Sequence, residues 1–209
     1  MPVAVTVPVL ELGLGTQEQR IIDAALACIG RWGTAKTTLD DVARQARCSR
    51  ATVYRLFPGG KEALLDAVAR TELARFFGAL SRRLATAVTP EDVFVAGMTE
   101  AGRRIRDHQG LQFLLAHEPG VILPRLAFAR ADEVLRHASA FAAPYLERWM
   151  AADDARRAAE FATRLTLSYS ICPSSEVDLT DEESVRALVR TFVLPALGPS
   201  SDPERGPRP

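Results

Sequence analysis

The stretch CSRATVYRLFPGGKEALL, residues 48–65, decides the fold because it specifies a short basic helix with a defined start and end. The Ser49 side chain can cap this helix by accepting hydrogen bonds from backbone amides two or three residues further on. Pro58 disfavours a helical Phe57, and the two glycines that follow complete the break. The pattern predicts a helix over 50–56.

A second helix is predicted just before this one. Thr37 or Thr38 can cap it, because an aspartate stands three residues after each threonine, where a carboxylate suits the positive end of a helix. About four residues separate this helix from the one over 50–56. An earlier apolar-periodic helix, over about 16–32, ends at Gly33. Two helices with so short a connection form a helix-turn-helix.

The polar side chains of the short helix suit DNA recognition, because a helix fits the major groove of B-DNA. Arg50 and Arg55 can bind phosphates or guanine edges, and Tyr54 can donate to a phosphate. Thr52 offers both a hydroxyl and a methyl group, and Lys61 is placed to touch the DNA backbone. The apolar residues of the same helix are expected to face inward, against Ile22, Leu26 and Leu39: they are Val53, Leu56 and Phe57.

Charge supports the same interpretation. Residues 31–61 contain seven basic and two acidic residues, a net charge of +5, in a chain whose formal net charge is zero. A locally basic segment on a neutral protein is the electrostatic footprint of a nucleic-acid-binding module. The alternative is an ordinary solvated helix face, which charge alone does not exclude.

The run TTLDDVARQARCSRATVYRLFPGGKEALLDAV resembles the DNA-binding domain of the TetR family of bacterial transcriptional regulators. The resemblance covers about 17–68 and rests on the cap, the turn, Tyr-x-x-Phe and Lys-Glu-Ala-Leu in that order. It implies that the chain binds double-stranded DNA. The candidate DNA-binding residues are Thr37, Thr38, Arg47, Ser49, Arg50, Ala51, Thr52, Tyr54, Arg55 and Lys61.

Two positions depart from the family pattern, which usually has glycine at position 47 and a small hydroxyl residue at position 60. Arg47 in a left-handed conformation would cost on the order of 1 kcal/mol relative to glycine, and it can add a phosphate contact. Gly60 is still an acceptable cap residue. Neither change removes the DNA-binding interpretation.

The composition, 47% hydrophobic and 25% charged over 209 residues, is typical of a globular protein. The sequence has no apolar run of about 18 residues that could span a membrane, and its start lacks the basic region of a signal peptide. Three widely spaced cysteines suit neither a disulfide framework nor a zinc site. We therefore expect a cytoplasmic protein with no membrane partner.

Nearly every segment with a clear period is helical, so the expected fold class is all-α, with about nine helices. The expected domains are a flexible arm over 1–15, the helix-turn-helix domain over 16–62, a helical domain over 63–197 and a disordered tail over 198–209. Pro119 and Gly120 are expected to close a short helix. Later helices are expected over 126–150, 154–170 and 180–197, the second capped by Asp153 or Asp154 and the third opened by Thr180.

The larger domain contains no nucleophile elbow, phosphate loop or dinucleotide fingerprint, and its three histidines are too dispersed for a metal site. No enzymatic activity, catalytic residue, cofactor or metal is therefore expected. The resemblance implies an effector-binding and dimerisation domain instead. Its large apolar side chains are either plain core or the lining of a pocket for a lipophilic effector, an acyl chain or acyl-CoA being the first choice. The candidate ligand-binding residues are Phe77, Phe94, Met98, Phe113, Leu114, Phe128, Phe141, Tyr145, Trp149, Phe161 and Leu165.

The last two helices are the expected dimer interface, because their apolar stripes can form a four-helix bundle with a second copy. Periodicity does not exclude that the stripes pack on their own chain. The candidate interface residues are Phe161, Leu165, Leu188, Phe192 and Val193.

Together these features predict a ligand-responsive repressor, in which a homodimer holds a palindromic operator until a small molecule releases it. The opposite sign, in which the ligand strengthens DNA binding, is equally compatible with the sequence. A further alternative is a helical binding protein or enzyme with a vestigial DNA-binding head.

Overall fold

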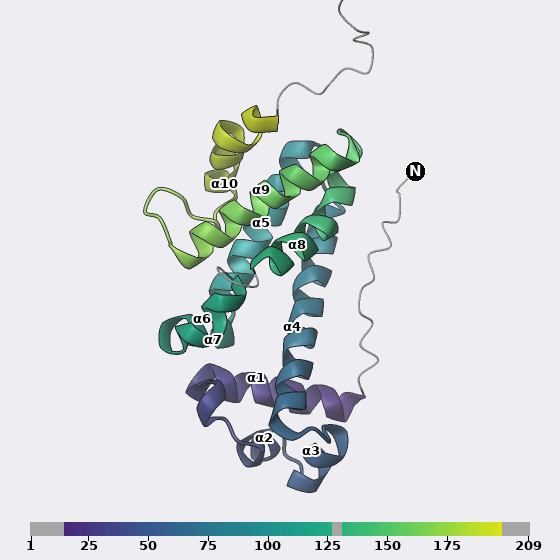
Figure 1. Ribbon diagram of the computed structural model, residues 1–209, viewed down its shortest axis with the longest axis vertical. Coiled ribbons are helices and arrows are strands. Elements are labelled where there is room, and N and C mark those ends of the chain that lie inside the picture. Colours follow the sequence, from purple (N-terminus) through teal and green to yellow (C-terminus); the bar gives the residue numbers. More distant parts are fainter. Residues whose placement is uncertain (1–14, 127–130, 198–209) are drawn as a thin grey trace, which may run out of the picture. The chain divides into compact units, whose positions relative to one another are not determined.

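The computed structural model describes residues 15–126 and 131–197, and Figure 1 shows its ribbon. Within these residues every regular element is a helix, which confirms the expected all-α class. The predicted arm, apart from residue 15, and the predicted tail lie outside the described residues. The α-helices are α1 (Thr16–Lys36), α2 (Leu39–Gln45), α3 (Arg50–Leu56), α4 (Gly60–Leu84), α5 (Pro90–Asp107), α6 (Gln109–His117), α7 (Pro119–Leu126), α8 (Ala131–Leu146), α9 (Ala152–Ile171) and α10 (Glu182–Leu188).

The chain divides into two compact units. Of the described residues, 15–79 and 104–126 form the N-terminal unit, and 80–103 and 131–197 form the C-terminal unit. Helices α4 and α5 therefore contribute residues to both units. Helices α6 and α7 group with the helix-turn-helix, although the sequence predicted a boundary near residue 62.

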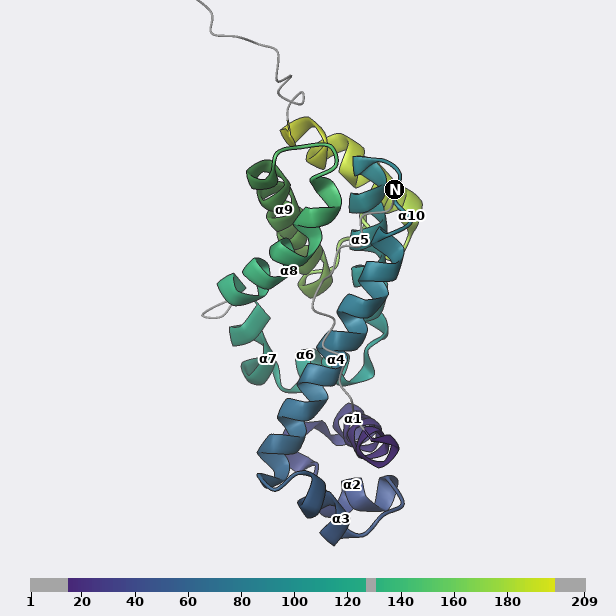
Figure 2. The ribbon, with the colours of Figure 1, turned by 90° about the vertical axis from the view of Figure 1, so that its right-hand side faces the viewer.

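Local signals position the first three helices as predicted. The helical backbone of α1 breaks at Gly33, where φ is 82° and ψ is 174°. Thr38 caps α2 in a reciprocal capping box with Asp41, and Ser49 caps α3. Figures 1 and 2 show α1, α2 and α3 gathered around the first turns of α4.

One apolar core holds the N-terminal unit together. Ile22 of α1, Val42 of α2 and Val53 of α3 are completely buried in it, and Phe57 and Leu64 join it. Leu26, Leu39 and Leu56 pack against this core, as their spacing predicts. Burying a side chain of this size contributes about 1.5–3 kcal/mol, so the core fixes the angle between α2 and α3.

Helix α7 is an element that the sequence reasoning missed. Pro119 and Gly120 were expected to close the preceding helix, but α6 already ends at His117 and Pro119 begins α7. Proline suits the first turn of a helix, because its missing N–H has no intrahelical partner there. The same signature therefore marks a start here, not a stop.

The C-terminal unit pairs α8 with α9, and α10 follows a loop. The expected aspartate cap of α9 is wrong: Ala151 occupies the N-cap position, and Asp153 and Asp154 lie in the first turn. There they bind Arg156 and Arg157. Asp181, one residue after the expected Thr180, caps α10 by accepting from the Ser184 amide.

The last predicted helix changes its winding. After α10 the chain forms a π-helical turn over Val189–Val193 and a short 3-10 helix over Pro195–Leu197. The Leu194 amide donates to the Val189 carbonyl, five residues back, at 2.9 Å. One extra residue in this turn shifts every later side chain around the helix axis.

Candidate DNA-binding surface

Helix α3 presents a polar face outward and an apolar face to the core. Arg50, Ala51, Tyr54 and Arg55 are exposed, whereas Val53 is completely buried. Arg50 and Tyr54 are four residues apart, as are Ala51 and Arg55, so each pair lies on one face of the helix and the two pairs form a continuous strip. A helix of this kind can enter a major groove while its other face stays attached to the protein.

The start of α3 is fixed by Ser49. Its hydroxyl oxygen accepts a hydrogen bond from the Thr52 amide at 3.1 Å and lies 2.9 Å from the Thr52 hydroxyl. A side-chain cap of this kind contributes about 1 kcal/mol to helix stability. Ser49 is exposed and Thr52 is half-buried, so both are accessible at the N-terminal end of α3.

The turn before α3 contains the unusual backbone that the family resemblance implied. Arg47 has a φ of 54°, in the left-handed region that favours glycine. Its amide donates to the Arg44 carbonyl, and the Cys48 amide donates to the Ala43 carbonyl at 3.0 Å. The Arg47 side chain is exposed, so it is available to a phosphate.

The two threonines at the start of α2 have different roles. Thr38 is exposed and its hydroxyl contacts Asp41 Oδ2 at 2.5 Å, which lowers the pKa of Asp41. Thr37 is only 3% exposed, and its hydroxyl donates to the Gly33 carbonyl at 2.6 Å. The prediction of Thr37 as a DNA contact is therefore wrong, because its side chain closes the turn after α1 and does not reach the surface.

Two further basic residues sit at the edges of this surface. Lys61 Nζ donates to the Ala35 carbonyl at 3.1 Å, and Arg55 donates to the Gln17 side chain at 3.4 Å. Both bonds are solvent-exposed, so phosphate oxygens can compete for the same donors.

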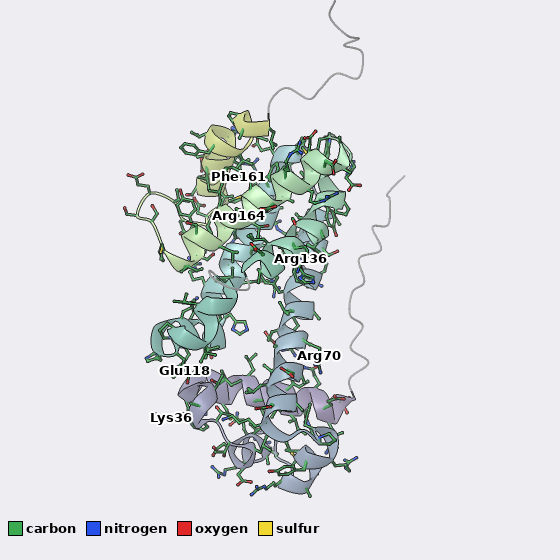
Figure 3. The ribbon with its side chains drawn as sticks, in the orientation of Figure 1. Lys36, Arg70, Glu118, Arg136, Phe161 and Arg164 are labelled. Atoms are coloured by element: carbon green, nitrogen blue, oxygen red, sulfur yellow. The ribbon has the colours of Figure 1, made fainter. Side chains whose placement is uncertain are left out.

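Glu118, at the corner between α6 and α7, is a residue that the sequence reasoning did not connect to this surface. Its carboxylate accepts from the Thr34 hydroxyl and amide and from the Ala35 amide. The Thr34 hydroxyl bond contributes most to lowering the pKa of Glu118. Figure 3 shows Glu118 close to the end of α1 that carries Lys36. The contact fixes the turn from which α2 begins.

Asp40 of α2 is a second residue that the sequence reasoning left off the surface. Its Oδ2 accepts from Arg50 Nη1 at 3.1 Å, while the Tyr54 hydroxyl accepts from Arg50 Nη2 at 3.2 Å. These contacts raise the pKa of the Arg50 guanidinium, the Tyr54 bond more than the Asp40 charge. Ten residues and a turn separate Asp40 from Arg50, so no local spacing predicts the pair.

Comparison with known proteins agrees with this geometry. Residues 21–68, which include α2, α3 and the start of α4, match the family described as "Bacterial regulatory proteins, tetR family". Two HTH-type transcriptional regulators of Mycobacterium tuberculosis, from strains CDC 1551 / Oshkosh and H37Rv, are each 29% identical over 185 residues. The alignments cover 87% of this chain and 86% of each relative. Residues 21–68 thus carry a TetR-family DNA-binding domain.

Solved structures share the fold over nearly the whole chain. The TetR family repressor AlkX from Dietzia sp., implicated in biodegradation of n-alkanes, has a TM-score of 0.60 and 22% identity, over 86% of this chain and 94% of its own. The fatty acid degradation regulator FadR from Bacillus halodurans also has a TM-score of 0.60, with 18% identity, over 87% and 98%. At these identities the likeness establishes the fold.

The residues predicted to line an effector pocket fall into different units. Phe77, Phe113 and Leu114 belong to the N-terminal unit, and Phe128 lies outside the described residues. Phe161 is 39% exposed, so its own chain does not enclose it as a pocket residue. The others lie in the C-terminal unit, where they are buried or half-buried: Phe94, Met98, Phe141, Tyr145, Trp149 and Leu165.

The candidate dimer residues differ in how much of each side chain is exposed. Leu188 and Val193 are 4% and 0% exposed, so the prediction that they form an interface is wrong, because both belong to the core of their own chain. Phe192 is 60% exposed and Phe161 39%. Leu165 is half-buried. Figure 3 shows Phe161 on α9, with Arg164 one turn further along.

Two further properties, membrane spans and metal sites, concern the described part of the chain. None of its helices combines the length and apolar character needed to cross a bilayer. Over the same residues, no group of three or more His, Cys, Asp and Glu side chains is placed to hold a metal ion.

Proposed function

We propose that this TetR-family regulator is a homodimeric repressor that binds a palindromic operator through α3 and is released by a small lipophilic effector. The observation that carries the DNA-binding part is the exposed strip of Arg50, Ala51, Tyr54 and Arg55, opposite the buried Val53. These side chains combine bidentate and single donors, which suit base edges and phosphates. Arg47, Thr38 and Ser49 extend the proposed contact area at either side.

The dimer proposal rests on Phe161 and Phe192. Each is a large apolar side chain left accessible on the C-terminal unit, 39% and 60% exposed. A second copy related by a two-fold axis would remove both from water. It would also present two α3 helices, which explains why the proposed operator is a palindrome.

Support for an effector comes from a buried hydroxyl in α5. The Thr99 side chain is 0% exposed, and its oxygen has no hydrogen-bond partner among the residues that the structure describes. An unsatisfied buried hydroxyl costs about 1–3 kcal/mol. A polar atom of a bound small molecule would satisfy it, while Phe94 and Met98, which are buried in the same helix, suit an apolar body.

The proposed chemical class is a fatty acyl chain, free or as its CoA thioester. Large apolar side chains outnumber polar ones among the candidate pocket residues, so the ligand would be bound mainly by burial of apolar surface. Two proteins of the same fold carry names that refer to n-alkane and fatty acid degradation. These names suggest fatty acyl compounds as probes. The buried residues of α5 are the reason to test such compounds for binding.

The DNA-binding part is tested with a fluorescent duplex from the region upstream of the chain's own gene. Binding of the wild type and of Arg50→Ala/Tyr54→Phe is measured at 50 and 200 mM salt. Removing phosphate-binding side chains must weaken binding and flatten the salt dependence, by about 0.9 in log–log slope for each phosphate that is no longer neutralised. Equal affinity and equal slope for the two proteins would remove α3 from DNA recognition.

The effector part is tested by native mass spectrometry of the freshly purified protein, followed by titration with palmitate and palmitoyl-CoA. We expect a mass of two chains with a lipid bound, and release of the duplex on titration. Tighter DNA binding on titration would reverse the sign of the response. No binding of either lipid would overturn the proposed class of effector.

A further inference from the structure

Asp40 stands next to the arginine that begins the recognition helix. It belongs to α2, and its carboxylate lies 3.1 Å from Nη1 of Arg50, the first residue of α3. Both side chains are accessible, with 54% of Asp40 and 59% of Arg50 exposed. An acidic side chain therefore lies directly beside the surface that is proposed to meet the phosphates of DNA.

Arg50 is held from a second side by Tyr54. The guanidinium donates to the Tyr54 hydroxyl at 3.2 Å, and its carbon lies 5.3 Å from the centre of the Tyr54 ring. Tyr54 is one helical turn after Arg50, so α3 itself supplies this contact. Two of the five guanidinium N–H groups are used by Asp40 and Tyr54, and the others stay available for a base.

The Asp40–Arg50 ion pair is not needed to hold α2 and α3 together. An exposed ion pair contributes little to stability, and α2 and α3 are already joined by Val42, Ala43, Val53 and Phe57, all buried. A carboxylate at this position also repels every phosphate that approaches, whatever the DNA sequence. Two effects of Asp40 therefore remain. It sets the direction in which the Arg50 side chain points, and it changes how the surface discriminates between DNA sequences.

We infer that Asp40 is a specificity-determining residue. It holds Arg50 against Tyr54, so that the guanidinium binds a base edge. In this position Arg50 does not neutralise the phosphates of arbitrary DNA sequences. The inference rests on the proposed DNA-binding function. A fixed guanidinium matches only a base with two acceptors at the right spacing, guanine being the usual partner. A released guanidinium would follow the phosphates of any duplex, which strengthens binding without adding discrimination.

The test starts with selection from a pool of random duplexes by the full-length wild type. The selected duplex and a scrambled duplex are then used to measure binding by three proteins: wild type, Asp40→Asn and Glu183→Gln. Glu183→Gln makes the same change of charge at an exposed position of α10, so it controls for net charge. A selection that enriches no sequence with the wild type refutes the proposed function itself, independently of Asp40.

We expect Asp40→Asn to bind the scrambled duplex several-fold more tightly and to lower the ratio of selected to scrambled affinity by about fivefold or more, since a bidentate base contact discriminates by at least that factor. Its salt dependence on scrambled DNA should steepen by about 0.9 for each head. Glu183→Gln should change neither quantity by more than a small factor. An unchanged ratio and salt dependence for Asp40→Asn would overturn the inference.

Asp40 is proposed to act by positioning Arg50. A second pair of variants distinguishes this from a direct effect of the Asp40 charge on DNA binding. In an Arg50→Ala background, Asp40→Asn should leave the affinity ratio unchanged, because the side chain that it positions is gone. The same loss of discrimination with and without Arg50 would contradict the inference. Thermal unfolding of each variant confirms that folded proteins are compared.

Discussion

The Thr34 hydroxyl donates a hydrogen bond of 2.5 Å to Glu118 Oε2, although 84 residues separate the two in sequence. The Thr34 amide donates to the same oxygen at 3.2 Å, and the Ala35 amide reaches the other oxygen at 3.5 Å. One carboxylate thus satisfies the donors of the turn that joins α1 to α2. Because α2 and α3 share a core, this contact also restrains α3.

Replacing Glu118 with glutamine should lower the free energy of unfolding by about 1–2 kcal/mol, because an amide NH2 group would face an N–H donor in place of an accepting oxygen. Urea unfolding at pH 7 measures the change. Glu183→Gln serves as the control, since that side chain is exposed. Equal unfolding midpoints for Glu118→Gln and the wild type would show that the contact does not stabilise the fold.

The same contact predicts a pH dependence. The pKa of Glu118 lies below its ordinary value of 4.5 in the folded protein, so its contribution is complete above that pH and is lost as the pH falls through the folded pKa. The stability difference between wild type and Glu118→Gln should be constant from pH 8 to about pH 5 and shrink below 4.5. A difference that grows on acidification would contradict this sign.

Gly33 is required beside Glu118. Its φ of 82° and ψ of 174° fall in a region open almost only to glycine, and an added Cβ would lie 2.0 Å from Glu118 Oε1 and 2.8 Å from Phe113 Cε1. Gly33→Ala should therefore lower the free energy of unfolding by about 2 kcal/mol or more, seen as a lower thermal midpoint. Gly120→Ala, where an added Cβ meets nothing within 4 Å, should have little effect.

Replacing Arg47 with glycine should change the stability of the fold and the affinity for DNA in opposite directions. Arg47→Gly removes a side chain from a left-handed backbone, φ 54°, and should raise the free energy of unfolding by about 0.5–1 kcal/mol. It should also weaken DNA binding and flatten the salt dependence, if the arginine contacts a phosphate as proposed. Arg47→Ala, which keeps the Cβ, should weaken DNA binding similarly without the gain in stability.

Thr99→Val replaces a buried hydroxyl by a methyl group of similar shape. The protein should become more stable by about 1 kcal/mol, because the oxygen has no partner among the described residues. If that oxygen contacts the effector, palmitoyl-CoA should release DNA less readily from the variant. Calorimetric unfolding measures the stability, and titration of the protein–duplex complex with the lipid measures the release of DNA. A destabilised variant would show that Thr99 has a partner in the folded protein.

Phe161 and Phe192 should control association. Changing both to serine should raise the dimer dissociation constant at least tenfold, the loss expected for central apolar contacts, without changing the unfolding of the monomer. Sedimentation velocity over a range of concentrations measures it. Leu73→Ser is the matched control, as Leu73 of α4 is 54% exposed and lies in the N-terminal unit. Equal dissociation constants would place the interface elsewhere.

The helix-turn-helix was predictable because its signals are local. Ser49 caps α3, Thr38 caps α2 with Asp41, and proline and two glycines end α3, all within a few residues of the elements they define. The contacts of Glu118 with Thr34 and of Asp40 with Arg50 were not predictable in this way. Each joins side chains that only the folded chain brings together.

The candidate dimer residues show why hydrophobic periodicity alone could not predict which apolar side chains of the last helix are exposed. Leu188, Phe192 and Val193 belong to one stripe of a regular helix, but the π-helical turn over Val189–Val193 inserts a residue into that stripe. Val193 is then buried and Phe192 is exposed. No spacing in the sequence marks this change of winding. An apolar stripe also does not show whether it packs against its own chain or against a second copy.

Hydrogen–deuterium exchange of the full-length protein, with and without the duplex enriched from a random pool, tests the proposed DNA-binding surface most directly. We predict that DNA slows exchange over residues 38–61, with the largest effect in α3 and at the turn containing Arg47. A bound duplex that leaves residues 47–56 as accessible as in the free protein, and protects another surface, would contradict the assignment of α3 as the recognition helix.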